Sequence, residues 1–286
     1  MFKIPKKIKE RIITGINRYQ KIVRTAKAKD VNEADTVSVI KGILEEAFGW
    51  DRFTEITSEY AIRGTYCDLA IKVEDSIKYL IEVKAAGIEL KESHMRQTIQ
   101  YGASLGMPWV VLTNGSQWRI YKIKFEKPLT HDLVVEFDFV GLNPNDDECL
   151  DILNLLTKEG VEKELREEYY KRIQTLNRFT VGHLLLSTPV IKAVRRELRG
   201  LFEGLKVEEE QLTKIVKDEV LKRDLFEGEK AEETKSIIQK NYRKIERAAK
   251  AKKAVKTSAK IETSPPPSNP IPDEAAAASG NQESAD

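Results

Sequence analysis

The chain has 286 residues, of which 33% are charged and 41% hydrophobic, and its formal net charge is +2. This composition excludes collagen-like, disulfide-scaffold and wholly disordered proteins, and the length allows one or two domains. No apolar run approaches the length of a transmembrane helix, and the basic N-terminus lacks the apolar segment of a secretory signal. The two cysteines, Cys67 and Cys149, match no metal-binding spacing, so we expect a reduced, cytoplasmic protein.

The small net charge hides an uneven distribution along the chain. Residues 1–29 carry a charge of +9 and residues 235–256 a charge of +8, whereas residues 257–286 carry −4. The middle of the chain is therefore acidic and lies between two basic arms. Such arms can contact nucleic-acid phosphates through counterion release, but they can equally be the solvated faces of helices.

Hydrophobic periodicity predicts helices at the start of the chain and strands after them. Apolar residues recur at spacings of three and four over 5–28, and a second helix over 32–48 has Asn32 as a suitable N-cap. The period then changes to that of strands, interrupted by one helix over 92–105. The predicted strands cover residues 66–73, 78–84, 108–113, 117–124 and 133–140. This order predicts an α/β fold with a mixed sheet flanked by helices.

After Pro144 the pattern is almost purely helical, with Gly or Pro between the segments. The last thirty residues hold five of the ten prolines and almost no large apolar groups, so we expect them to be disordered. The sequence therefore predicts four parts: a basic N-terminal helix over 1–30, an α/β domain over 31–143, a helical domain over 144–256 and a disordered tail over 257–286.

Two acidic residues and a lysine form the most informative pattern. Glu82 and Lys84 are two residues apart on a predicted strand, so they share one face. A hairpin centred on Asp75 pairs positions whose numbers sum to 150, which places Asp68 opposite Glu82 with Cβ atoms roughly 4.5–5.5 Å apart. A slip of one residue would put Asp68 on the other face.

Two carboxylates so placed repel each other unless one is protonated or a cation lies between them. Mg²⁺ suits such a site, because it takes one or two carboxylates together with water and substrate phosphate. Lys84 is then placed to orient a metal-bound water or to stabilise charge growing on a phosphate. The pattern therefore predicts metal-assisted phosphodiester hydrolysis. The alternative is a solvent-facing strand that carries these residues by chance.

Gln97 and Tyr101 lie four residues apart on the predicted helix that follows, and so share one face. A Gln amide and a Tyr hydroxyl can bind phosphate oxygens or position a lysine. An ordinary polar helix face with a half-buried tyrosine would give the same pattern.

Four features together resemble the N-terminal nuclease domain of type I restriction enzyme R subunits, within the PD-(D/E)xK nuclease superfamily. They are the helix NEADTVSVIKGILEEAFGWD over 32–51, Asp68 followed by IEVK over 81–84, QTIQY over 97–101, and WVVLTNGSQWRIY over 109–121. The third matches the Q-x-x-x-Y motif of RecB-like nucleases. The resemblance covers residues 33–123, about a third of the chain.

The resemblance implies a restriction-endonuclease-like fold and a role for each matching residue. Asp68 and Glu82 would bind Mg²⁺ together with the backbone carbonyl of Val83, and Lys84 would be catalytic. Gln97 and Tyr101 would place DNA near the metal. Such nucleases often have a further acid on the first helix, which Glu33 matches best by its position in NEADT, with Glu45 and Glu46 as rivals.

The chain contains no G-x-x-x-x-G-K-[ST] motif, so we expect a nuclease domain without a helicase motor. The first hypothesis is a Mg²⁺-dependent endonuclease that cuts double-stranded DNA in restriction or another defence system. The alternative is a catalytically idle DNA-binding or assembly subunit that keeps the nuclease fold, and an RNA-directed nuclease is a third possibility. Candidate partners are DNA, other restriction or defence subunits, or a second copy of the chain. We expect no binding to a membrane.

Overall fold

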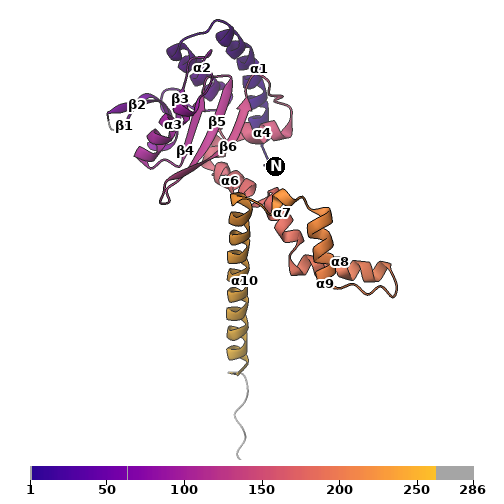
Figure 1. Cartoon of the computed structure of the whole chain (residues 1–286). Coiled ribbons are helices and arrows are strands. Elements are labelled where there is room, and N and C mark those ends of the chain that lie inside the picture. The colour runs from indigo at the N-terminus through magenta and orange to yellow at the C-terminus, as the bar shows by residue number, and fades with distance from the viewer. Residues whose placement is uncertain (1, 63, 262–286) are drawn as a thin grey trace, which may run out of the picture. The chain divides into compact units, whose positions relative to one another are not determined.

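The computed structural model describes residues 2–62 and 64–261, and the chain divides into two compact units, Met1–Thr175 and Leu176–Asp286. The first unit contains the described strands and several helices (Figure 1). Its elements are α1 (Lys6–Ala28), α2 (Glu33–Glu46), β1 (Ile56–Ile62), β2 (Thr65–Val73), β3 (Ser76–Val83), α3 (Glu92–Leu105), β4 (Trp109–Thr113), β5 (Gln117–Lys124), β6 (Thr130–Asp138), α4 (Asp147–Asn154), α5 (Lys158–Glu162) and α6 (Leu165–Thr175).

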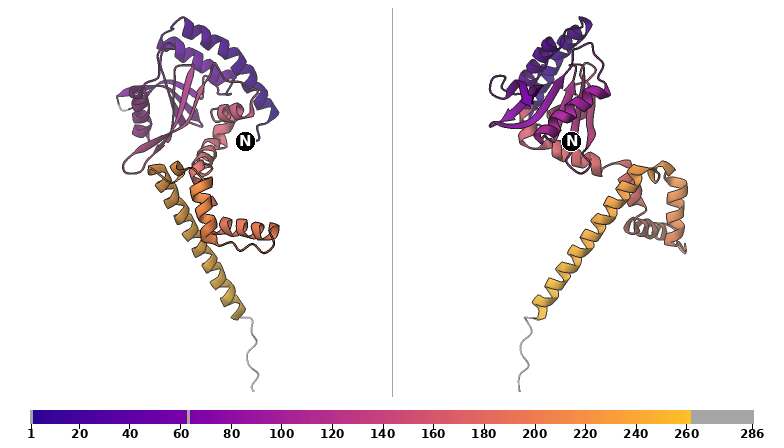
Figure 2. Two further views of the ribbon diagram at one scale, coloured as in Figure 1. Left: turned by 45° about the vertical axis from the view of Figure 1, so that its right-hand side comes forward. Right: turned by 60° about the vertical axis from the view of Figure 1, so that its left-hand side comes forward.

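The strands form one six-stranded sheet in the order β1-β2-β3-β4-β5-β6. Strands β3 and β4 are parallel and are joined through α3, whereas the other neighbours are antiparallel. Helices α1 and α2 cover one face of this mixed sheet and α3 covers the other, as Figure 2 shows from two further sides. The predicted α/β fold class is therefore confirmed.

Local sequence signals account for most element boundaries. Asn32 caps α2 as predicted, because its side-chain oxygen accepts a hydrogen bond from the Asp35 amide at 2.9 Å. Strand β1 was not predicted from the sequence. Only Ile56 and Ile62, at its two ends, are buried, so this edge strand lacks a clear alternation of apolar and polar residues.

The first unit extends beyond the predicted boundary at residue 143, because α4 and the residues after it pack into the same core. Leu150, Leu153 and Leu156 belong to the cluster formed by α1, α2 and the sheet. The indole N–H of Trp50 donates to the carbonyl of Leu156 at 2.8 Å, which joins the segment after α2 to the segment after α4.

Helix α6 is attached to the sheet through a buried arginine. The Arg166 side chain is only 5% exposed, and its guanidinium lies 4.5 Å from the ring centre of Tyr79 and 5.4 Å from that of Trp109. Burial lowers the pKa of Arg166 to about 10. The cation is stabilised by the two aromatic faces, which explains why α6 belongs to the first unit.

The second unit is helical, as predicted. It contains a small buried cluster of Ile191, Val207 and Leu212. The last helix reaches Ile261, so the predicted tail begins too early, and its part from residue 262 onward lies outside the described residues. No described helix combines the length and apolar character that crossing a membrane requires. The elements of this unit are α7 (Arg178–Leu185), α8 (Thr188–Leu201), α9 (Glu209–Ile215), the π-helix η1 (Val216–Val220), the 3₁₀ helix η2 (Arg223–Leu225) and α10 (Glu229–Ile261).

Candidate active site

The site is built on the β2–β3 hairpin, whose turn differs from the predicted one. Val73 pairs with Ser76, and the two residues between them, Glu74 and Asp75, have φ angles of 49° and 62°. Two positive φ angles in a two-residue loop are typical of a type I′ turn. The turn is therefore centred between Glu74 and Asp75, and not on Asp75.

A β-bulge between the turn and the site shifts the strand pairing back to the predicted register. Lys72 pairs with Ile77 but Ile71 pairs with Tyr79, so Lys78 is an extra residue on β3. From Ile71 onward the paired numbers sum to 150, and the pair Leu69–Ile81 leaves Asp68 beside Glu82. The predicted neighbourhood of the two acids is correct, although the bulge produces it. Without the bulge, Asp68 would align with Ile81 on the opposite face.

Short polar contacts hold the three predicted residues together at the end of β3. The Val83 amide donates to Oδ2 of Asp68 at 2.7 Å, and the Lys84 ammonium donates to Oε1 of Glu82 at 2.6 Å. The same ammonium lies 3.7 Å from Oε2 of Glu33. Asp68, Glu82 and Lys84 thus form one cluster with Glu33.

Of the three candidate acids on the first helix of the motif, only Glu33 reaches this cluster. It is the first residue of α2, whose start lies near the end of β3. Glu46 instead accepts hydrogen bonds from Arg18 and Tyr19, both at 2.8 Å. Glu45 is exposed elsewhere on α2.

Burial and mutual repulsion control the protonation of the cluster. The Glu82 side chain is 3% exposed, and burial together with the charge of Asp68 raises the pKa of Glu82 to about 7. Burial also raises the pKa of Asp68, although the Val83 amide opposes this. Burial acts to lower the pKa of Lys84, but the three surrounding carboxylates outweigh it and raise that pKa. The cluster therefore favours bound positive charge.

Glu82 should make the metal-free protein less stable as the pH rises. Its carboxyl group loses a proton near pH 4.5 in the unfolded chain but only near pH 7 in the folded one. The free energy of unfolding should therefore fall between these pH values, by up to about 3 kcal/mol. We expect Glu82→Gln to be more stable than the parent near pH 8 and similar to it near pH 4, as measured by urea unfolding in EDTA.

The matched control for this experiment is Glu89→Gln, which removes an exposed carboxylate from the loop after β3. The free energy of unfolding of this variant should equal that of the parent at every pH. If Glu82→Gln also keeps the pH dependence of the parent, the deduced protonation of Glu82 is wrong.

The donor set fits a divalent cation. Oε2 of Glu82 is buried and has no hydrogen-bond partner among the described residues, which is costly unless something binds it. Within the described part of the chain, no three His, Cys, Asp or Glu side chains are grouped so that they could hold a metal ion by themselves. Mg²⁺ does not need three, because it keeps several waters and takes one or two carboxylates with substrate phosphate. Asp68 and Glu82 meet that requirement.

Helix α3 brings Gln97 and Tyr101 together on the same side of the sheet as Glu82. The Gln97 amide donates to the Tyr101 hydroxyl at 2.8 Å, and Tyr101 packs on the cluster that contains Leu80 and Leu112. No contact joins either side chain to Asp68, Glu82 or Lys84 in the structure described. Their predicted role toward DNA stays a prediction.

His94 lies on the first turn of α3, close enough to Lys84 and Glu33 for their charges to act on its ring. Burial and the charges of Lys84 and Lys91 lower its pKa. Its Nδ1 accepts the Lys91 amide at 3.3 Å, which leaves Nε2 as the donor in the neutral ring. The sequence feature that could have pointed to His94 is its position one turn before Gln97 on the same helix.

Two side chains that the sequence did not assign to the site hold the loop between Lys84 and α3. The Asn114 amide donates to the carbonyl of Ile88 at 2.7 Å, and Arg119 donates to the carbonyl of Leu90 at 3.0 Å. These contacts fix the path of the loop that joins the lysine to the helix of Gln97 and Tyr101.

Cys67 directly precedes Asp68 on β2. Its thiol is buried and donates to the carbonyl of Ile81 at 3.3 Å. Burial raises the pKa of Cys67, so the thiol stays neutral and serves the packing of the hairpin.

A comparison with protein families found a match to the segment that carries most of the candidate site. Residues 52–135 match the family model described as type I restriction enzyme R protein N terminus (HSDR_N). This part of the chain is similar to the N-terminal domain of type I restriction enzyme R proteins. The match confirms the resemblance predicted from the sequence, and it includes Asp68, Glu82, Lys84, Gln97 and Tyr101. Helix α1 and Glu33 lie outside the matched segment of the R-protein domain.

The chain thus contains a restriction-related, nuclease-like domain. Comparisons with curated proteins and with solved structures found no match to the chain.

Proposed function

We propose that this chain is a Mg²⁺-dependent endonuclease that hydrolyses DNA phosphodiester bonds in a restriction or related defence system. The observation that carries this proposal is the buried Glu82 carboxylate beside Asp68, with one oxygen on the Lys84 ammonium and the other unpartnered. The similarity of residues 52–135 to the N-terminal domain of R proteins supports DNA as the substrate and other restriction subunits as partners.

Asp68 and Glu82 would hold Mg²⁺, and the Val83 carbonyl is the predicted further ligand. When bound, Mg²⁺ would supply positive charge to the scissile phosphate and ease the deprotonation of a water. The Lys84 ammonium would donate a hydrogen bond to the phosphate oxygens as negative charge develops on them. The Asp68 carboxylate is held in place by the Val83 amide.

The side chains on α3 would bind the DNA rather than the metal. The amide of Gln97 and the hydroxyl of Tyr101 are joined to each other and both can bond to phosphate oxygens. His94 carries a neutral ring with one free donor, which suits the same task.

Incubation of supercoiled plasmid with the full chain tests the proposal. We expect nicked or linear plasmid in Mg²⁺ and none in EDTA. Cleavage that continues unchanged in EDTA would contradict the metal site, and cleavage of RNA but not of DNA would correct the substrate.

A catalytically idle DNA-binding or assembly subunit is the second candidate. It is favoured by the Lys84–Glu82 ion pair, which neutralises one carboxylate without any metal. This candidate predicts DNA binding without cleavage in every divalent metal. A homodimer and a cytoplasmic location stay predictions.

A further inference from the structure

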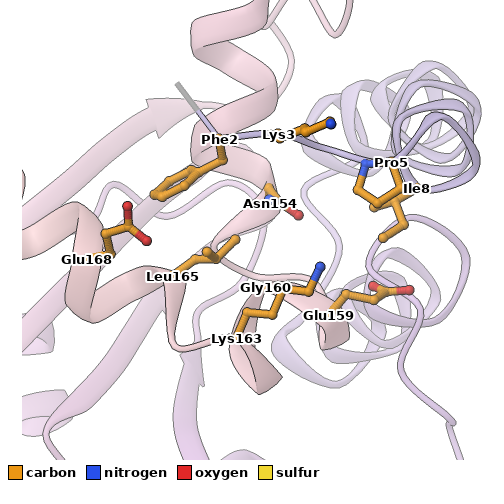
Figure 3. Close-up of a pocket in the computed structure, with 10 residues that line it drawn as sticks. All are labelled: Phe2, Lys3, Pro5, Ile8, Asn154, Glu159, Gly160, Lys163, Leu165 and Glu168. Atoms are coloured by element: carbon orange, nitrogen blue, oxygen red, sulfur yellow. The ribbon is translucent and has the colours of Figure 1, made fainter.

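One group of cations on the basic helix α1 pairs with acids of other elements and helps to hold the first unit together. Lys9 pairs with Asp147 at 3.0 Å, Arg11 with Glu159 at 2.6 Å and Arg18 with Glu46 at 2.8 Å. The start of the helix borders a cavity of about 270 Å³ between Phe2, Glu159 and Leu165 (Figure 3). These three cations are therefore used in contacts within the protein, whereas Lys6 and Lys7 at the same end of α1 are exposed.

The second group lies at the other end of the helix and consists of Lys21, Arg24, Lys27 and Lys29, which we name the α1-end cluster. All four side chains are exposed. None of them forms an ion pair with another residue in the ranges that the structure describes. Their charges therefore contribute little to folding and remain available to an external anion.

The α1-end cluster lies next to the candidate active site. Helix α1 ends at Ala28, and after a short connection α2 begins at Glu33, which lies 3.7 Å from the Lys84 ammonium. The Ala86 amide, two residues after Lys84, donates to the carbonyl of Val31 in that connection at 3.3 Å. Figure 1 shows α1 running from the N-terminus to the place where α2 begins.

A second contact makes this connection tight. A Cβ atom at Gly87 would lie 1.8 Å from Oδ1 of Asp30, so the Asp30 side chain reaches the loop after β3. The end of α1 and the loop that follows Lys84 therefore form one continuous surface.

The charge of the site itself offers DNA no net attraction. Glu33, Asp68 and Glu82 outnumber the single ammonium of Lys84, and one bound divalent cation brings the net charge of these groups only to zero. Attraction between exposed charges is screened within about 8–10 Å at physiological salt, so the cations that attract the phosphates next to the cut must lie close to the site. Of the two groups of cations on α1, only the α1-end cluster lies close to the site.

We propose that the α1-end cluster binds the phosphates of a DNA duplex next to the position of the cut. This inference rests on the proposed nuclease function, since it names the surface that presents DNA to that site. It concerns a helix outside the segment that matches the R-protein family.

Two variants with the same change of charge test this inference. The α1-end variant has Arg24, Lys27 and Lys29 replaced by glutamine. The control variant has Lys3, Lys6 and Lys7 replaced by glutamine. Lys6 and Lys27 are about 30 Å apart along the helix, so the control changes net charge far from the site. Binding of a fluorescent DNA duplex to the full chain is followed by anisotropy in Ca²⁺, with thermal unfolding as a check on the fold.

Relative to the parent, we expect the α1-end variant to bind the duplex at least about tenfold more weakly near 0.1 M salt. We also expect the slope of log affinity against log salt to become shallower by about 2–3, since each lost phosphate contact contributes about 0.9. The control should change affinity by less than about threefold.

Equal weakening in both variants would mean that only net charge matters, and would overturn the inference. An α1-end variant with the affinity and salt slope of the parent would also overturn it, while leaving the proposed nuclease function intact. A parent chain that binds no duplex would instead overturn the proposed function, and the inference with it.

Discussion

Replacement of Lys84 by alanine is expected to lower plasmid cleavage by at least about a hundredfold, the usual cost of removing a donor to developing transition-state charge. The Lys84 ammonium is the only cation in contact with the acids of the candidate site among the described residues. Lys84 follows Val83, the last residue of β3, and its backbone amide, which alanine keeps, donates to the carbonyl of Thr113 at 2.8 Å, so the sheet should stay intact. Initial rates of plasmid nicking and circular dichroism measure the two effects.

The matched control is Lys124→Ala on the same sheet. Lys124 also pairs with a carboxylate, that of Asp132 at 3.1 Å, but it belongs to β5 and has no contact with the site. This variant should cut plasmid at the rate of the parent. If the Lys84→Ala protein cuts as fast as the parent, Lys84 has no catalytic role.

Addition of Mg²⁺ is expected to raise the stability of the parent chain, because the cation relieves the repulsion between Asp68 and Glu82. Binding to the folded state alone contributes about 2.7 kcal/mol at a hundred times the dissociation constant. For a unit of this size, that corresponds to a rise in Tm of about 5–10 °C. In Asp68→Asn most of this rise should disappear, as measured by thermal unfolding with and without Mg²⁺.

Asp75→Asn is the control for this second experiment. Asp75 lies in the turn of the same hairpin with a positive φ, a conformation that asparagine also adopts readily. It should keep the full response to Mg²⁺. An undiminished response in Asp68→Asn would mean that the cation binds elsewhere.

The core of the candidate site could be predicted from the sequence because it depends on local periodicity. Glu82 and Lys84 share a face on any strand, and an (i, i+4) pair such as Gln97 and Tyr101 shares a face on any helix. The position of Asp68 could not be derived so securely. The sequence predicts a hairpin centred on Asp75, whereas the real turn is centred between Glu74 and Asp75. The extra residue Lys78 in the bulge restores the predicted pairing before the strands reach Asp68.

Features that depend on tertiary packing could not be predicted. Nothing in the residue types separates Glu33 from Glu45 and Glu46, since only the path from α1 to α2 brings the first of them to Lys84. The apolar residues of α4 have the same pattern whether they pack on the sheet or in a separate helical domain. Their contacts with the first core decide the limit of the unit.

The central claim is that Asp68 and Glu82 share one divalent cation beside Lys84. A crystal structure of the full chain with Mn²⁺, which replaces Mg²⁺ and gives an anomalous signal, tests it most directly. We predict an anomalous peak about 2.0–2.3 Å from an oxygen of each carboxylate. A peak bound elsewhere, or ordered Asp68 and Glu82 carboxylates with no peak between them in saturating Mn²⁺, would contradict the claim.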